Sequence, residues 1–331
     1  MNAGIYLDQS MERLNMNRNK GYSFITIILG TWITVLLAPL PAQAQLWTWT
    51  KDQMLDYTKA WAGGRFPDGR PRVPDAVLAR ARELSMEEIM INWDGGSGAG
   101  GSSHNPYSQY EDGWQVLHPG KMLVGRAVTM AFMPARADLD SVVTGKAKEK
   151  GVDRLGNQYV IDMLQPGDVL VVDLYGKKDG GTIVGDNLFY YIMKATRTGG
   201  LVVDGSIRDL QGIAEMDMPA YFRHAHPSPI GGATLSAVNV PIRIGNVTVM
   251  PGDIVIGDRE GVAFVPPQLI QQIIDGADTL HVHDEWTRKK FDEGKYKSSE
   301  IYGSPRDAAL KQEYQEYLKK RLEEIRNKAP K

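Results

Sequence analysis

Short runs of apolar residues, separated by turns rich in glycine and proline, fill the middle of this 331-residue chain. The run from Asp168 to Asp173 is apolar throughout its interior, as expected for a strand buried on both faces. Turn sequences such as Pro251-Gly252-Asp253 separate the later runs and indicate hairpins. Strands are predicted at 122–130, 168–173, 201–204, 220–222, 240–244, 247–250, 254–256 and 262–265.

Segments with helical periodicity or good helix formers lie before, between and after these strands. Helices are predicted at 53–62, 75–90, 185–196, 266–277 and 306–327. Gly199-Gly200 are expected to end the helix 185–196 in a left-handed conformation. A strand–helix–strand unit followed by hairpins is typical of a mixed α/β fold, which we therefore predict.

The first 44 residues have the pattern of a secretory signal peptide. Basic residues precede an apolar run from Phe24 to Leu40, and an Ala-x-Ala motif ends at Ala44. This order predicts cleavage after Ala44 and a mature protein that is periplasmic in a Gram-negative host, or secreted. The alternative is an uncleaved anchor, because the run approaches the length of a membrane span. No later segment is apolar and long enough to give a stable span after cleavage.

The remaining chain divides into three predicted parts. Residues 45–73 are an aromatic and proline-rich extension, residues 74–280 the main domain, and residues 281–331 a charged helical tail. The apolar stripe of the tail helix is expected to pack on its own core or on a neighbouring subunit. The aromatic extension is also expected to pack on its own domain or on a neighbouring subunit. A third alternative is that its rings form a platform that binds carbohydrate. The glycine-rich segment 95–103 is expected to be a loop, either a lid or a solvated insertion.

Charge and composition exclude several classes of protein. The formal net charge of −2 gives no electrostatic case for nucleic-acid binding. The sequence has no cysteine, which excludes disulfides, thiolate metal sites and cysteine nucleophiles. The P-loop motif G-x-x-x-x-G-K-S/T and the nucleophile elbow G-x-S-x-G are also missing, so these two classes of enzyme lack support.

The segment from Gly185 to Asp209 contains the most informative polar residues. A helix that begins at Gly185-Asp186 offers free backbone N–H groups and a positive dipole end, which suit a carboxylate or phosphate. Arg208-Asp209 follow a buried strand and place a cation beside a carboxylate. Together these groups can bind and polarise a small oxo-acid. The structural alternatives are Asp186 as a helix N-cap and Arg208-Asp209 as a surface ion pair.

Four blocks of sequence resemble, in order, the RraA-like family. They are PGDVLVVD at 166–173, VGDNL at 184–188, GGLVVDGSIRD at 199–209 and VTVMPGDIVIGDREGVAFVP at 247–266. This family includes 4-hydroxy-4-methyl-2-oxoglutarate aldolases, oxaloacetate decarboxylases and an inhibitor of RNase E, and its members are often labelled demethylmenaquinone methyltransferases. The resemblance covers about residues 74–280. It implies a compact α/β fold with a central barrel-like sheet, assembled as a homotrimer or homohexamer with sites at the subunit interfaces.

The resemblance also implies roles for particular residues. The catalytic Asp and Arg-Asp of the family correspond to Asp186, Arg208 and Asp209. The spacer between them has 21 residues here, where the family usually has 20, and we place the extra residue in the turn 196–200. Asp209 is then expected to bind Mg²⁺ or Mn²⁺. Arg208 is expected to hold a keto acid and to stabilise the enolate that forms when a C–C bond beside a pyruvyl unit breaks.

The helix start would complete this site. The backbone N–H groups after Gly185, those of Asp186, Asn187 and Leu188, are expected to hold the substrate carboxylate. The Asp186 side chain would hold a metal-bound water that moves the proton.

These expectations favour an exported, divalent-metal-dependent lyase of the aldolase or decarboxylase type, with a small oxo-acid as substrate. The alternative is a non-catalytic RraA-like binding protein, although a signal peptide argues against RNase E as its partner. A third possibility is a pocket remade for a larger substrate such as a sugar acid.

Other site candidates carry weaker signals. His224 and His226 would face the same side of a strand, which permits a metal pair, although two structural histidines would give the same pattern. Arg223 is a candidate for substrate contact. Asp258 and Glu260 lie in a tight turn and are candidates for carboxylates offered to a neighbouring subunit.

Overall fold

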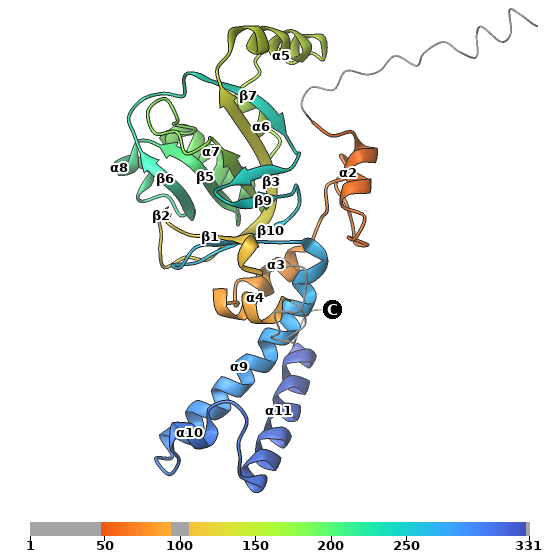
Figure 1. Cartoon of the computed structure of the whole chain (residues 1–331), viewed down its shortest axis with the longest axis vertical. Helices are drawn as coiled ribbons and strands as arrows, with labels where there is room; N and C mark the ends of the chain where they lie inside the picture. The colour runs from red at the N-terminus through yellow and green to blue at the C-terminus, as the bar shows by residue number, and fades with distance from the viewer. Residues whose placement is uncertain (1–47, 94–105, 329–331) are drawn as a thin grey trace, which may run out of the picture. The chain divides into compact units, whose positions relative to one another are not determined.

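The computed structural model describes residues 48–93 and 106–328, and its elements are labelled in Figure 1. The helices are α2 (Lys51–Tyr57), α3 (Asp75–Ala81), α4 (Met86–Asn92), α5 (Ala137–Glu149), α6 (Asn157–Ile161), α7 (Asp186–Thr196), α8 (Leu210–Ile213), α9 (Ile270–Asp292), α10 (Ser298–Ile301) and α11 (Ala308–Lys328), with 3-10 turns η1 (Pro106–Gln109) and η2 (Pro267–Leu269). The predicted signal peptide 1–44 and the glycine-rich segment 95–103 lie outside the described residues.

The strands follow the predicted runs closely and add three that were not predicted. They are β1 (Tyr110–Glu111), β2 (Gln115–Val116), β3 (Leu123–Pro134), β4 (Asp168–Asp173), β5 (Gly200–Ile207), β6 (Ala220–Ala225), β7 (Ala233–Val238), β8 (Ile242–Ile244), β9 (Val247–Val249), β10 (Ile254–Gly257) and β11 (Val262–Val265). Within the described residues, none of the helices has the length and apolar character that crossing a membrane requires.

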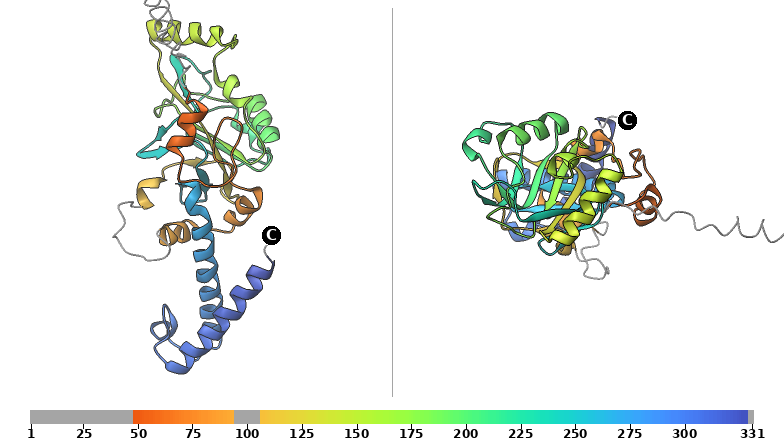
Figure 2. Two further views of the ribbon diagram at one scale, coloured as in Figure 1. Left: turned by 90° about the vertical axis from the view of Figure 1, so that its right-hand side faces the viewer. Right: turned by 90° about the horizontal axis from the view of Figure 1, so that it is seen from above.

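A curled nine-stranded sheet forms the centre of the domain. Its order is β1-β11-β10-β3-β4-β5-β6-β2, with β7 paired to β3. The four strands β3 to β6 run parallel to one another, and their neighbours on both sides run antiparallel. Only residues 112–114 separate the two edge strands β1 and β2, so the edges must lie close together and the sheet curls (Figure 2). The predicted α/β fold with a barrel-like central sheet is confirmed.

Three clusters of buried apolar side chains hold the layers together. One joins the outer face of β4 and β5 to α6, α7 and α8. A second joins β3, β10 and β11 to α3, α4 and the first half of α9. The third fills the inside of the curl, where Ile242 and Val249 of the β8–β9 hairpin meet Val171 and Val202. Because both faces of β4 and β5 are covered, these strands read as continuous apolar runs.

The helix predicted at 75–90 is in fact two helices. The side chain of Ser85 accepts the N–H of Glu88 at 3.2 Å, and the Glu88 carboxylate accepts the N–H of Ser85 at 2.8 Å. This capping box starts α4 as a new helix.

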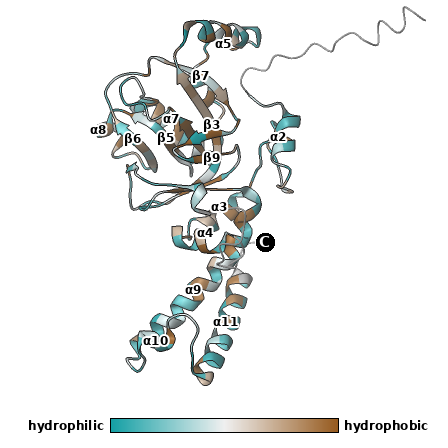
Figure 3. Cartoon of the chain, viewed as in Figure 1, coloured by the Kyte–Doolittle hydropathy of each residue, from teal (hydrophilic) through white to brown (hydrophobic). Residues whose placement is uncertain are grey.

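The helix predicted to end near residue 277 instead continues to Asp292 as α9, and α11 packs against it (Figure 1). Hydrophobic and hydrophilic residues alternate along both helices (Figure 3), as amphipathic packing requires.

The prediction that Gly199-Gly200 end α7 in a left-handed conformation is wrong. The residue with positive φ is Arg197, at 59°. The two glycines serve close packing instead. A Cβ on Gly199 would overlap the carbonyl of Asp168, and a Cβ on Gly200 would overlap the Leu123 side chain. The α7–β5 connection therefore needs glycine because the backbone lies directly against its neighbours.

A buried ion pair ties the N-terminal extension to the sheet. The two terminal nitrogens of Arg70 donate to the two carboxylate oxygens of Asp168, each at 3.0 Å. Asp168 begins β4, and Nε of Arg126 on β3 lies 3.7 Å from the same carboxylate. All three side chains are buried. Since a bidentate pair of this kind has a fixed geometry, the extension is part of the folded domain.

The second Pro-Gly-Asp turn, at residues 251–253, buries its carboxylate without a cation. Asp253 Oδ2 accepts the N–H of Met250 at 2.8 Å, and Asp253 is 3% exposed. Burial raises the pKa of Asp253 to about 7. The folded protein therefore holds a proton on this carboxyl group over a pH range in which an unfolded chain would release it.

We expect Arg70→Met to lower the free energy of unfolding by about 3–5 kcal/mol, because it leaves the buried Asp168 with less compensation for its charge. Urea denaturation measures the change. The matched control is Arg136→Met, which breaks an equally short pair with Asp138 (2.8 Å) on the exposed surface. That control should cost less than about 1 kcal/mol, and equal losses would contradict the structural role of Arg70.

The raised pKa of Asp253 predicts a pH dependence of stability. The folded state binds the extra proton, so the free energy of unfolding should fall as pH rises from 5 to 8. Asp253→Asn does not titrate and should lack this component, which makes the two proteins diverge by roughly 2 kcal/mol over that range. Urea denaturation at several pH values tests this, and a constant difference between the two proteins would refute it.

Candidate active site

A short parallel pairing brings the two ends of the predicted site together. The segment 181–184 lies beside the end of β5, where the N–H of Ile183 donates to the Ser206 carbonyl at 3.0 Å. One step further, the N–H of Arg208 donates to the Val184 carbonyl at 3.2 Å. Gly185, which follows Val184 and precedes α7, is therefore placed directly against Arg208.

Gly185 makes this contact possible because it has no side chain. A Cβ at this position would lie 2.9 Å from Nε of Arg208 and closer still to Oδ2 of Asp209. Both distances are shorter than a carbon atom can accept without displacing its neighbours. Gly185 was predicted to begin the helix start that suits an anion. It also lets the Arg208 and Asp209 side chains lie directly against the backbone.

Asp209 has an unusual backbone conformation at the start of α8. Its φ and ψ are 60° and 39°, in the left-handed region, and its carbonyl accepts the N–H groups of Gly212 and Ile213. Aspartate tolerates this region better than most residues, but the conformation still costs energy. Strained residues of this kind cluster at functional sites, so this conformation makes Asp209 a candidate site residue.

The side chains of Arg208 and Asp209 are half-exposed, at 37% and 43%. Nε of Arg208 lies 3.4 Å from Asp209 Oδ2, and the same oxygen accepts the N–H of Asp186 at 3.3 Å. The other oxygen of Asp209 has no polar partner among the described residues, and the same holds for the terminal nitrogens of Arg208. One carboxylate oxygen and one guanidinium edge are therefore available to a ligand.

Two backbone N–H groups in the first turn of α7 already donate to protein carboxylates. Asp186 is the first residue of the helix rather than its N-cap, and its Oδ1 accepts the N–H of Asn187 at 2.7 Å. Asp209 accepts the N–H of Asp186. Two of the three N–H groups that were expected to hold substrate are therefore bonded to protein carboxylates. Carboxylates are favoured at the positive end of a helix dipole, and the N–H of Leu188 is the third group of that set.

Arg223 is engaged elsewhere. It donates to Asp204 on β5 at 2.9 Å, pairs with Glu111 at 2.5 Å, and stacks over the ring of Trp114 at 3.8 Å. These contacts join β5 and β6 to the segment that connects the edge strands. Its guanidinium therefore supports the closure of the sheet, and no described contact links it to Arg208 or Asp209.

The structure gives His226 of the predicted histidine pair local contacts. Nδ1 of His226 lies 2.8 Å from the hydroxyl of Ser228, and its backbone N–H donates to the Ile207 carbonyl. Across the described ranges 48–93 and 106–328, no group of three or more histidine and carboxylate side chains could hold a metal ion. A magnesium site that uses one or two carboxylates, with water as the remaining ligands, falls below that number.

The 258–260 turn also has local structural contacts. Asp258 Oδ1 accepts the backbone N–H groups of Glu260 and Gly261, which closes the turn. The Glu260 carbonyl accepts the hydroxyl of Tyr110 at 2.7 Å. Nothing in the described chain joins this turn to Asp186, Arg208 or Asp209, which the structure brings together with Gly185 at the start of α7.

We expect Gly185→Ala to lower the free energy of unfolding by about 1–3 kcal/mol, since the added methyl group must displace Arg208 and Asp209. The control is Gly145→Ala in α5, where no atom lies within 4 Å of the added carbon. That change should be neutral or stabilising by up to about 1 kcal/mol. Urea denaturation compares the two, and an unaffected Gly185→Ala protein would contradict the contact.

Comparison with known proteins identifies relatives of this chain. The sequence model of the RraA-like family, described as Aldolase/RraA, matches residues 101–264. A protein of Halalkalibacterium halodurans is 30% identical over 36% of this chain and 56% of its own length. One of Azotobacter vinelandii is 36% identical over 33% of this chain and 66% of its own length. Both bear a provisional name as a 4-hydroxy-4-methyl-2-oxoglutarate aldolase.

A solved structure extends the likeness to the fold. RraAS2 of Streptomyces coelicolor, described as an unusual member of the RNase ES inhibitor RraA protein family, is 28% identical and superposes with a TM-score of 0.53. The match covers all of that chain and 66% of this one. The chain thus spans only part of the curated relatives but the whole of this structural neighbour. It belongs to the RraA-like family.

Proposed function

We propose that this protein is a divalent-metal-dependent lyase of the aldolase or decarboxylase type, which cleaves a C–C bond beside a pyruvyl unit. The observation that carries the proposal is the contact of Gly185, at the start of α7, with the Arg208–Asp209 pair. It combines a helix N-terminus, a fixed cation and an available carboxylate oxygen in one place. The provisional aldolase names of the two relatives support the reaction class.

Arg208 is the residue suited to the developing charge. Cleavage beside a keto group leaves negative charge on the keto oxygen, which a nearby cation stabilises. The guanidinium is permanently charged and planar, and its position is set by Asp209 at 3.4 Å and by the backbone bond to Val184. Its terminal nitrogens can therefore orient a keto acid without a change in the surrounding fold.

The donor set fits a hard divalent cation. Asp209 is half-exposed and offers a carboxylate oxygen with no polar partner among the described residues. Asp186 adjoins it, since the backbone N–H of Asp186 bonds to Asp209. Mg²⁺ is commonly held by one or two carboxylates and keeps several waters. In this proposal Asp209 holds Mg²⁺ or Mn²⁺, which when bound acts as a Lewis acid for the substrate carbonyl.

Asp186 is the candidate for proton transfer. It is partly buried on the first turn of α7 and faces the start of α8, where a Cβ on Gly212 would lie 3.4 Å from its own Cβ. Its Oδ1 is held by the N–H of Asn187, which fixes the orientation of the carboxylate. From this position it can accept or return a proton through one water molecule.

A second function has a specific observation in its favour. The structural neighbour RraAS2 belongs to a family of RNase inhibitors, so a non-catalytic binding role is the alternative. The two differ in what they require of the site. A lyase needs the free oxygen of Asp209, whereas a binding protein would keep the fold without any turnover.

Two further parts of the proposal rest on the sequence and on the family. We propose that residues 1–44 direct export and are removed after Ala44, which would place the enzyme in the periplasm or outside the cell. We also propose a homotrimer or homohexamer. Edman sequencing of the purified mature protein and light scattering measure these two properties.

Turnover tests the proposed function. Protein with Mg²⁺ or Mn²⁺ should release pyruvate from oxaloacetate or from a 4-hydroxy-2-oxo acid, and removal of the metal by EDTA should abolish the reaction. Asp209→Asn should lower kcat/KM at least about 100-fold, as loss of an electrostatic contact in the transition state does. Asp138→Asn, an exposed carboxylate on α5, is the control and should retain full activity.

A coupled lactate dehydrogenase assay detects the pyruvate. Arg208→Lys keeps the charge and loses the planar fork, so it should also lower kcat/KM. No release from any member of the substrate panel would favour the binding-protein alternative. Undiminished turnover by Asp209→Asn would remove that residue from the mechanism.

A further inference from the structure

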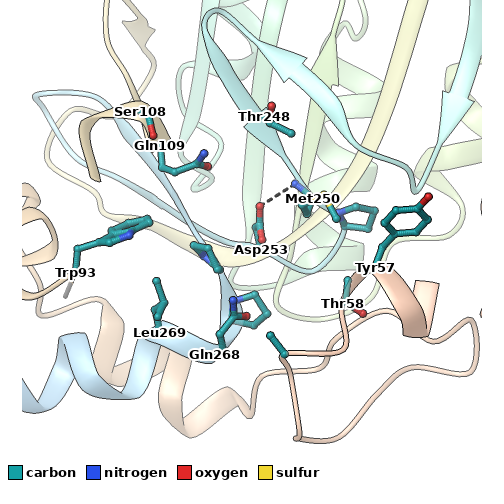
Figure 4. Close-up of a pocket in the computed structure, with 14 residues that line it drawn as sticks. Tyr57, Thr58, Trp93, Ser108, Gln109, Thr248, Met250, Asp253, Gln268 and Leu269 are labelled. Carbon is teal, nitrogen blue, oxygen red and sulfur yellow. Dashed lines mark hydrogen bonds between the residues drawn. The ribbon is translucent and has the colours of Figure 1, made fainter. Parts of the chain in front are cut away.

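A cavity lies where the N-terminal extension meets the RraA-like domain. Its volume is about 390 Å³, within the range of small-molecule sites. Figure 4 shows Tyr57 and Thr58 on one side, Trp93 and Leu269 on another, and Asp253 between them. Most of the lining is apolar, with a few polar side chains. This is the composition of a ligand site rather than of a solvated surface groove.

The extension forms one wall of this cavity and is held firmly in place. Beyond the buried Arg70–Asp168 pair, Arg65 donates to the Thr58 carbonyl and hydroxyl at 2.8 and 2.7 Å. Pro71 packs on Gly252, where a Cβ would lie 2.7 Å from Cδ of Pro71. The wall therefore belongs to the folded domain. Since the family match begins at residue 101, Tyr57 and Trp93 come from parts of this chain outside it.

The cavity is separate from the candidate active site. Asp253 precedes Ile254, which pairs with Arg126, and Arg126 pairs with Asp168 at the start of β4. Arg208 follows the other end of the parallel strands, after Ile207. At about 3.3 Å per residue, the length of β5 separates the two by roughly 20 Å. A ligand in the cavity would not touch Arg208 or Asp209.

The carboxyl group of Asp253 is the chemical feature of the cavity. Oδ2 accepts the N–H of Met250, and Oδ1 has no hydrogen-bond donor among the described residues. Apart from Asp253 itself, Tyr57 is the only titratable side chain among the described residues that line the cavity, so the lining offers no cation. Burial has raised the pKa of Asp253 to about 7, which is the response of a carboxyl group that lacks a counter-charge.

We propose that this cavity binds a small primary amine with an apolar body, whose ammonium group pairs with Oδ1 of Asp253. The ammonium supplies the positive charge that the lining lacks and donates to the free oxygen. The rings of Tyr57 and Trp93 offer faces that attract a cation and pack an apolar body. An anionic ligand would meet the Asp253 carboxylate with no cation to compensate, and a neutral one would leave that carboxylate unpaired.

Three probes of similar shape and different charge test this assignment. They are 2-phenylethylamine, 2-phenylethanol and phenylacetate, titrated into the full chain by isothermal calorimetry at pH 7.5. The amine should bind at least about tenfold more tightly than the alcohol, and phenylacetate should not bind. Equal affinity of the amine and the alcohol, or no heat from the amine at millimolar concentration, overturns the proposal.

Two variants locate the binding. Asp253→Asn can still accept the Met250 N–H and should lose the preference for the amine over the alcohol. Tyr57→Ala alters an exposed residue (62%), so it should change stability little, and it should weaken binding of the amine several-fold. Asp209→Asn, at the other end of the sheet, should bind the amine like the wild type. Amine binding that survives both cavity changes, or that is lost in Asp209→Asn, places the ligand elsewhere and contradicts the assignment.

Discussion

The pairing of residues 181–184 with the end of β5 is the constraint on which the candidate active site depends. Two backbone hydrogen bonds, at Ile183 and Arg208, set the start of α7 against the end of a buried strand. Gly185 lies so close to the Arg208 and Asp209 side chains that this position must lack a side chain of its own. The left-handed turn at Asp209 follows directly after this pairing. Fixed backbone thereby holds a cation, a carboxylate and a helix start together, as electrostatic catalysis requires.

The chain buries the carboxylates of its two Pro-Gly-Asp turns in different ways. Asp168 is compensated by two buried arginines, one of them from the extension, and the result is a rigid attachment. Asp253 has a single backbone N–H and no cation. The first arrangement costs desolvation, and the protein itself supplies the opposite charge. The second leaves a carboxylate without a neighbouring positive charge at the edge of a cavity. A cationic ligand there therefore has a physical reason to bind.

The sequence predicted the sheet, which the structure confirms, and three candidate site residues, whose roles stay predictions, because both leave local signals. Buried parallel strands read as apolar runs, and Asp186, Arg208 and Asp209 lie at element ends, where polar residues stand out. The pairing of 181–184 with β5 has no such signal, because it joins residues distant in sequence. The break between α3 and α4 was visible in the Ser85–Glu88 capping box but was missed. The role of Gly199-Gly200 depends on Asp168 and Leu123, which no local pattern indicates.

The most direct test of the central claim is whether Arg208 and Asp209 hold a metal and a keto-acid mimic together. Oxalate resembles the enolate of pyruvate in size and charge, and a ligand that binds only the folded state raises its melting temperature. We expect Mn²⁺ with oxalate to raise Tm by several degrees in the wild type, more than either alone, and to have no effect on Asp209→Asn. An equal rise in both proteins, or none in the wild type, would contradict the account.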